Sequence, residues 1–299
     1  MKQFRISAIS AFLMITLSGP FVLAEIREDG APASALALGD AVNATALGAP
    51  ALYFNPAGMS RIRAYAIEAG YNFSNDLDGH TFTFSTVDSK TNKWLGMGVG
   101  YSYISSLYSG LDRDGHSIRG ALSTGYHGKG LSILLGVAGR YASLARGEAD
   151  TDENGGSDDI NFFTIDLGLM AAVGSAFSAG IVGRNLIDTT QVTEAPRQVG
   201  FGLAGHHKGF QASVDLNLDL QSSPTDEVLL GYAIGAQYLI NKTLVVRLGF
   251  SGGGFSAEKK VSGGISYISK LMGVDLSFRH NIDRTVDTMM SLGVKFFLP

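Results

Sequence analysis

From Arg63 to the end of the chain, apolar and polar residues alternate with a period of two. The clearest example is residues 209–220, where Val214 and Leu216 share one face while Ser213, Asp215 and Asn217 share the other. This period is typical of β-strands that have one apolar and one polar face. It predicts fourteen strands, approximately at 63–73, 79–88, 93–104, 116–126, 130–143, 160–173, 175–187, 195–206, 208–220, 228–240, 242–251, 259–268, 271–281 and 286–298.

The connections between these strands alternate in length. The longer ones include 105–115 and 144–159, and the shorter ones include the turns near 127 and 241. Outer-membrane barrels have long loops outside and short turns on the periplasmic side, and most of the predicted strands are long enough to cross a bilayer. We therefore predict an all-β fold, a transmembrane antiparallel up-and-down β-barrel of about 14 strands.

The chain before Arg63 divides into two segments. Residues 1–24 have a cationic start, an apolar centre and a small residue at Ala24, which predicts a secretory signal peptide. Residues 25–62 are rich in Ala and Gly and suit a compact plug, or hatch, inside the barrel. The expected domains are thus the signal peptide (1–24), the hatch (25–62) and the barrel (63–299), placed in the outer membrane of a Gram-negative bacterium and surrounded by its lipid and lipopolysaccharide.

Composition excludes some functions. The net charge of -4 and the absence of a basic run argue against nucleic acid, and a chain without Cys has no disulfide framework. The polar face of the predicted strands carries five acids and six bases, a balance that favours paired charges bracing the lumen over an ion-selective ring. These predicted lumenal charges are Glu68, Arg119, Arg140, Asp166, Arg184, Asp215, Asp219, Arg247, Asp275, Arg279 and Lys295.

Catalytic and metal chemistry have little support in the sequence. Asp150, Asp152, Asn154 and Asp158 partly match a calcium loop, but Asn161 stands where a bidentate Glu is needed. The six histidines form no metal-binding spacing, and His116 and Ser117 lie on opposite faces of a strand. We expect no enzyme, no metal site and no cofactor.

The stretch ALYFNPAGMSR at residues 51–61 marks the boundary between the hatch and the barrel. Pro56 restricts its own backbone and that of Asn55, while Gly58 permits a tight path. From the residues alone, an ordinary Asn-Pro turn and a hatch hinge are equally acceptable.

This stretch resembles the FadL-like outer-membrane family and its PorV-like relatives, which carry an NPAG-type motif before the first barrel strand. Here the matching residues are Asn55, Pro56, Ala57 and Gly58. The resemblance implies a fourteen-stranded barrel, a gating role for these four residues, and passive transport of hydrophobic small molecules such as fatty acid-like or aromatic compounds. Hatch residues that would then face a ligand are Leu47, Leu52, Tyr53, Phe54 and Met59. The alternative is a PorV-like barrel that transports nothing and serves as a partner in protein secretion or surface assembly, a reading favoured by short outer loops and a charged lumen.

Overall fold

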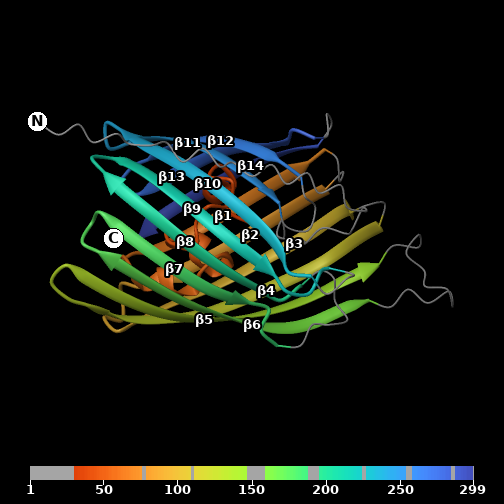
Figure 1. The fold of residues 1–299 in the computed structure, drawn as a ribbon, viewed down its shortest axis with the longest axis horizontal. Coiled ribbons are helices and arrows are strands. Elements are labelled where there is room, and N and C mark those ends of the chain that lie inside the picture. Colours follow the sequence, from red (N-terminus) through yellow and green to blue (C-terminus); the bar gives the residue numbers. More distant parts are fainter. Residues whose placement is uncertain are drawn as a thin grey trace, which may run out of the picture.

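A computed structural model describes residues 30–75, 79–108, 111–146, 159–187, 195–223, 227–253, 258–283 and 287–298. Fourteen antiparallel strands form one closed barrel, in which each strand pairs with its neighbours in sequence and the first pairs with the last (Figure 1). The all-β barrel prediction is confirmed. The strands are β1 (Tyr65–Ser74), β2 (Gly79–Asp88), β3 (Leu95–Tyr108), β4 (Leu111–His127), β5 (Leu131–Arg146), β6 (Ile160–Val173), β7 (Phe177–Arg184), β8 (Gln198–His207), β9 (Phe210–Asp219), β10 (Leu229–Ile240), β11 (Leu244–Gly253), β12 (Lys260–Ile268), β13 (Met272–Asn281) and β14 (Thr288–Leu298).

Several strand boundaries differ from the prediction, and the structure explains the differences between β3 and β4 and at the end of β7. The expected outer loop at 105–115 is wrong, because β3 and β4 keep pairing as far as Tyr108 and Leu111. Strand β7 ends at Arg184 and not at 187, because Asn185 adopts a left-handed φ of 53°. The Asn185 N–H leaves the ladder and donates to the Asp166 carboxylate at 2.8 Å.

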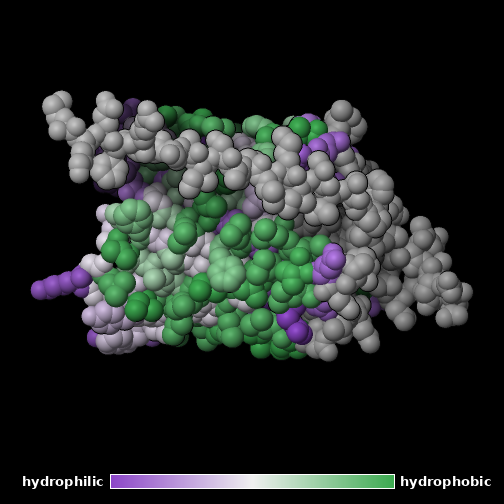
Figure 2. Space-filling view, viewed as in Figure 1, coloured by the Kyte–Doolittle hydropathy of each residue, from purple (hydrophilic) through white to green (hydrophobic). Residues whose placement is uncertain are grey.

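The outer wall of the barrel is apolar. Large hydrophobic side chains are exposed along the strands, and in β6 exposed residues alternate with buried ones over most of its length. Figure 2 shows hydrophobic residues covering much of the visible wall. At the ends of strands near the short turns, this surface carries exposed aromatics, including Trp94, Tyr126, Phe177, Phe210, Tyr238, Tyr267 and Phe296. Such a band, bordered by an aromatic girdle, is the surface that a barrel presents to lipid.

The helices found in the described residues are short and lie before the barrel. They are α1 (Ala33–Leu36), α2 (Ala49–Tyr53) and the 3-10 helix η1 (Pro56–Ser60). None of the helices within the described ranges is long and apolar enough to cross a membrane.

These helices belong to residues 30–62, which we call the lumenal segment and which lies within the barrel (Figure 1). Most of its residues are buried, and its apolar side chains, among them Leu38, Val42, Leu52 and Met59, form one cluster that also includes small wall residues. Its Ala-rich composition follows from this position, because the lumen of a barrel this size has little room for bulky side chains beside a second layer of backbone.

Glycines of the wall let the lumenal segment approach closely. A Cβ added at Gly180 of β7 would overlap the Asn43 carbonyl oxygen, and one at Gly235 of β10 would lie 2.8 Å from the Leu38 carbonyl oxygen. The same conflict arises at Gly136, Gly168, Gly202, Gly249 and Gly264. The segment is therefore held by backbone-to-wall contact around much of the barrel, and not by a few side chains alone.

Candidate functional site

The NPAG stretch forms a capped helical turn against the wall. Asn55 is extended, with φ -153° and ψ 101°, as expected for a residue before proline. Its side-chain oxygen accepts the Ala57 N–H at 3.2 Å and so caps η1, which begins at Pro56. Gly58 faces the first half of the lumenal segment so closely that a Cβ would overlap the Ala46 carbonyl oxygen. Asn55, Pro56 and Gly58 thus each have a local structural reason.

The Asn55 side chain also joins three parts of the molecule. It is fully buried, and its amide donates to the Asn43 carbonyl at 2.8 Å and to the Leu169 carbonyl of β6 at 3.3 Å. One side chain therefore connects η1, the preceding arm of the lumenal segment and the barrel wall. An unpaired amide at a fully buried site would be costly, so these bonds fix the position of the turn.

Asn43 is held from the other side by the wall. Its N–H donates to the Asp215 carboxylate at 2.7 Å, and its amide donates to Asn217 at 3.2 Å. Arg184 of β7 donates to the Asn43 side-chain oxygen, and at 3.0 Å to the Phe54 carbonyl. We call Asn43, Asn55, Arg184, Asp215 and Asn217 the polar clamp.

Further polar contacts anchor the rest of the lumenal segment. Asp40 receives a hydrogen bond and ion pair from Arg279 of β13 at 2.5 Å. Arg61 donates to the Ala44 carbonyl at 3.0 Å, and burial lowers the pKa of its guanidinium from the ordinary value. Three more hydrogen bonds hold the segment. Asn72 donates to the Ala31 carbonyl, Ser213 to the Ala41 carbonyl, and Lys295 to the Ser34 hydroxyl.

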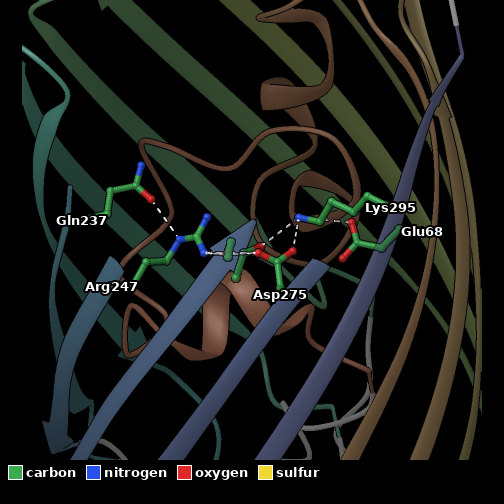
Figure 3. Close-up of polar contacts among 7 residues, drawn as sticks. Glu68, Gln237, Arg247, Asp275 and Lys295 are labelled. Carbon is green, nitrogen blue, oxygen red and sulfur yellow. Dashed lines mark hydrogen bonds and ion pairs between the residues drawn. The ribbon is translucent and has the colours of Figure 1, made fainter. Parts of the chain in front are cut away.

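A second charged group braces the wall on the opposite side of the lumen from η1. Lys295 of β14 lies 3.5 Å from Glu68 of β1 and 3.0 Å from Asp275 of β13. Asp275 is also 3.2 Å from Arg247 of β11, which donates to Gln237 of β10 at 3.0 Å. Figure 3 shows these side chains converging from neighbouring strands into one chain of contacts. Because both signs are paired, the group offers structural support and no single-sign field for ions.

A third group lies on β4, β5 and β6. Arg119 and Arg140 are direct cross-strand partners; Arg119 lies 3.8 Å from Asp166. The Arg119 guanidinium stacks 5.0 Å from the Tyr53 ring, and that of Arg140 stacks 4.9 Å from the Phe162 ring. Beside them, near the outer end of the lumen, is an apolar cluster of Ile104, Ala142, Leu144, Ile160, Phe162 and Ala195. This region joins buried apolar side chains to cationic groups.

The eleven charges expected on the lumenal face include ten buried residues, while Lys295 is partly exposed. Asp219 is buried at the outer end of β9, where it accepts the N–H groups of Gln221 and Ser222. Thus the structure distributes these charges among separate groups and does not gather them into one site.

The five hatch residues expected to face a ligand lie in different surroundings. Leu52 and Met59 pack on the wall at Gly98, where an added Cβ would lie 2.8 Å and 3.1 Å from them. Tyr53 and Phe54 are also buried, and Leu47 is half-buried. In the described part of the chain, Leu52 and Met59 therefore fill space between the segment and the wall.

The histidines are spread over the barrel and are not gathered into a site. His80 and His116 lie on the outward face, each bonded to a neighbouring tyrosine hydroxyl, at 2.6 Å and 2.7 Å. No group of three or more His, Asp or Glu suited to a metal occurs among the described residues. The partial calcium loop at 150–158 lies outside the described residues.

Four residues that hold the lumenal segment are not among the site residues predicted from the sequence. Asp40 and Asn43 are the strongly polar residues of an otherwise small and apolar stretch, and that isolation was a usable signal. Ser213 and Asn217 alternate with apolar residues on β9 like any lumenal polar residue, so the sequence offers no sign that they bind the segment.

Solved structures of other proteins share this architecture. No protein-family model and no curated protein sequence matches the chain. A solved structure titled "CymD monoaromatic hydrocarbon channel" matches with a TM-score of 0.65 at 14% identity, over 92% of this chain and 98% of that one. The Pseudomonas putida toluene transporter TodX matches with a TM-score of 0.63 at 13% identity, over 93% and 98%. The Acinetobacter baumannii outer membrane protein Omp33 matches with a TM-score of 0.50 at 11% identity, over 79% and 98%.

The three matches differ in how much of this chain they cover. The barrel from Tyr65 to Leu298 makes up about 78% of the chain (234 of 299 residues). The Omp33 match is about that long, whereas the CymD and TodX matches are longer and must extend into the residues before Tyr65. By fold, the chain is an integral outer-membrane β-barrel, and its likeness to the two hydrocarbon channels includes part of the region that precedes the barrel.

Proposed function

We propose that the chain is a passive channel for hydrophobic small molecules, in which the lumenal segment acts as the gate. The observation that carries the proposal is the extent of the CymD and TodX matches, which include residues before the barrel. Those two structures are titled as a channel and a transporter for monoaromatic hydrocarbons. Small aromatic hydrocarbons are accordingly the first substrates to test.

The lumen supports the same proposal. At its outer end, Ile104, Leu144, Ile160 and Phe162 form an apolar cluster on β3, β5 and β6. These side chains are buried in this state, so they would receive an apolar solute from the outside once the residues that cover them move. The lumenal segment closes the way beyond this cluster, so passage requires this segment to move. The polar clamp and the NPAG turn are the contacts that such a movement would break.

The alternative, a PorV-like partner in secretion or surface assembly, has no support from the compared structures, whose names are those of a channel, a transporter and an outer membrane protein. A stable complex recovered from native membranes would be needed to revive it.

The test is toluene uptake by Gram-negative cells, whose lipopolysaccharide layer slows passive permeation. Cells that produce the chain should take up radiolabelled toluene faster than cells with an empty vector. Uptake indistinguishable from the vector, with correctly assembled protein in the outer membrane, would refute the channel.

A cross-link tests the gate separately. A Cβ added at Gly293 of β14 would lie 3.6 Å from the Ala33 Cβ of α1, within the range of a disulfide, and the natural chain has no cysteine. The double variant Ala33→Cys/Gly293→Cys should lose uptake when oxidised and regain it when reduced. Each single variant, which cannot form this bond, is the control; undiminished uptake in the oxidised double variant would show that α1 need not move.

A further inference from the structure

A groove of about 620 Å³ lies on the outer face of the barrel, across β1 to β5. Its floor is formed at Gly120 and Gly139, which are direct cross-strand partners and point outward. A Cβ placed on Gly120 would meet no atom within 4 Å, so the recess exists because this position lacks a side chain. The outward side chains of Met97, Val99, Leu122 and Val137 form its apolar sides.

The wall behind the groove is continuous. Strands β2, β3, β4 and β5 pair without interruption through the residues that line it. The groove is therefore open toward lipid and closed toward the lumen, and it differs in place from the channel proposed above.

The periplasmic end of the groove, at Tyr65 and Asp88, borders a basic turn. Residues 89–94 follow Asp88, and their side chains include the exposed Lys90 and Lys93. Hydrogen bonds fix the conformation of this turn. The Arg63 guanidinium donates to the carbonyls of Ser89 and Asn92, at 2.8 Å and 2.7 Å, and to that of Lys93.

The Asp88 carboxylate belongs to the same turn. One of its oxygens accepts the N–H groups of Lys90 and Thr91, each at 2.9 Å, so it acts as a turn cap beside the lysines. The Lys93 ammonium lies 5.1 Å from the centre of the Trp94 ring, and Trp94 belongs to the exposed aromatics near the short turns. Because such aromatics lie at the headgroup level, the two lysines are placed where lipid phosphates are found.

We propose that this groove binds an anionic phospholipid of the periplasmic leaflet, with an acyl chain along Gly120 and Gly139 and the phosphate at Lys90 and Lys93. An apolar recess in a lipid-facing wall is filled by an apolar chain, since an empty recess forfeits dispersion contacts. The basic turn at one end selects a chain that carries a negative headgroup. The apolar groove matches the acyl chain of a phospholipid, and the positively charged turn at its end matches the phosphate of the same molecule.

Native mass spectrometry of the full-length protein in detergent, titrated with phosphatidylglycerol or phosphatidylcholine, tests the proposal. The natural chain should retain phosphatidylglycerol in preference to phosphatidylcholine. Lys90→Gln/Lys93→Gln should weaken phosphatidylglycerol binding about thirtyfold, which corresponds to about 1 kcal/mol for each lysine. Gly120→Leu, which fills open space, should weaken it at least about tenfold.

The matched control is Lys208→Gln/Lys242→Gln, which removes two exposed lysines from short turns away from the groove. It should leave binding unchanged, and heat-dependent gel mobility should show that every variant is assembled. Equal binding of both lipids, or equal loss in the control, would overturn the proposal. So would loss of toluene uptake in Gly120→Leu together with displacement of bound lipid by toluene, because the groove would then belong to the transport route.

Discussion

Asn55→Ala should release the lumenal segment from the wall. The side chain is fully buried and makes three hydrogen bonds, accepting from Ala57 and donating to the carbonyls of Asn43 and Leu169. Loss of a helix cap costs about 1 kcal/mol, and a buried polar group left without its partner costs about 1 to 3 kcal/mol. The docked state should therefore lose about 3 kcal/mol, which raises the undocked-to-docked ratio by about a hundredfold.

Single-channel recording in planar bilayers, together with leakage of a small sugar from proteoliposomes, measures this ratio. Asn55→Ala should show more frequent open events and faster leakage than the natural chain. Asn55→Asp keeps an oxygen for the Ala57 N–H and removes both donated bonds, so its leakage should also rise.

Asn92→Ala is the matched control. The Asn92 oxygen also caps a turn, accepting the N–H groups of Trp94 and Leu95 at 2.8 Å and 3.2 Å, but it lies in an exposed turn outside the lumen. The Asn92→Ala variant should lose order in this turn but should leak no faster than the natural chain. If Asn55→Ala leaks no more than Asn92→Ala while both assemble normally, the NPAG stretch is a plain turn and not a gate hinge.

Three further outcomes are expected. Gly180→Ala should weaken docking of the lumenal segment by about 1 to 3 kcal/mol, because the methyl group would overlap a carbonyl of that segment; Gly205→Ala, whose methyl group would lie 3.9 Å from the nearest ring, should match the natural chain in the same leakage assay. Asp275→Asn should lower barrel stability by about 3 kcal/mol in urea unfolding from lipid vesicles, since two wall cations lose their shared anion; an unchanged midpoint would refute this. A double-mutant cycle on Asp40 and Arg279 should give a coupling of at least about 1 kcal/mol in the leakage assay, and additive single effects would show that the pair does not anchor the segment.

The period of two was enough to predict the barrel. It placed most strand ends within a few residues, because lipid on one face and the lumen on the other impose opposite solvents on successive side chains. The strand ends predicted from this period were wrong where contacts other than those with lipid decide how far a strand extends. At their outer ends β3 and β4 continue as a paired hairpin, and at Asn185 a left-handed residue and an Asp166 hydrogen bond end β7 early.

The local form of the NPAG turn was also determined by sequence, since proline restricts the residue before it and asparagine caps a helix through its nearest neighbours. The two carbonyls to which the Asn55 amide donates could not be predicted from the local sequence. Asn43 and Leu169 lie 12 and 114 residues away, and only the closed barrel brings both carbonyls to one amide. The same holds for the pairing of Lys295 with Glu68, because β1 and β14 become neighbours only when the sheet closes. Alternation specifies which face a side chain occupies, whereas its partner depends on the order and stagger of all fourteen strands.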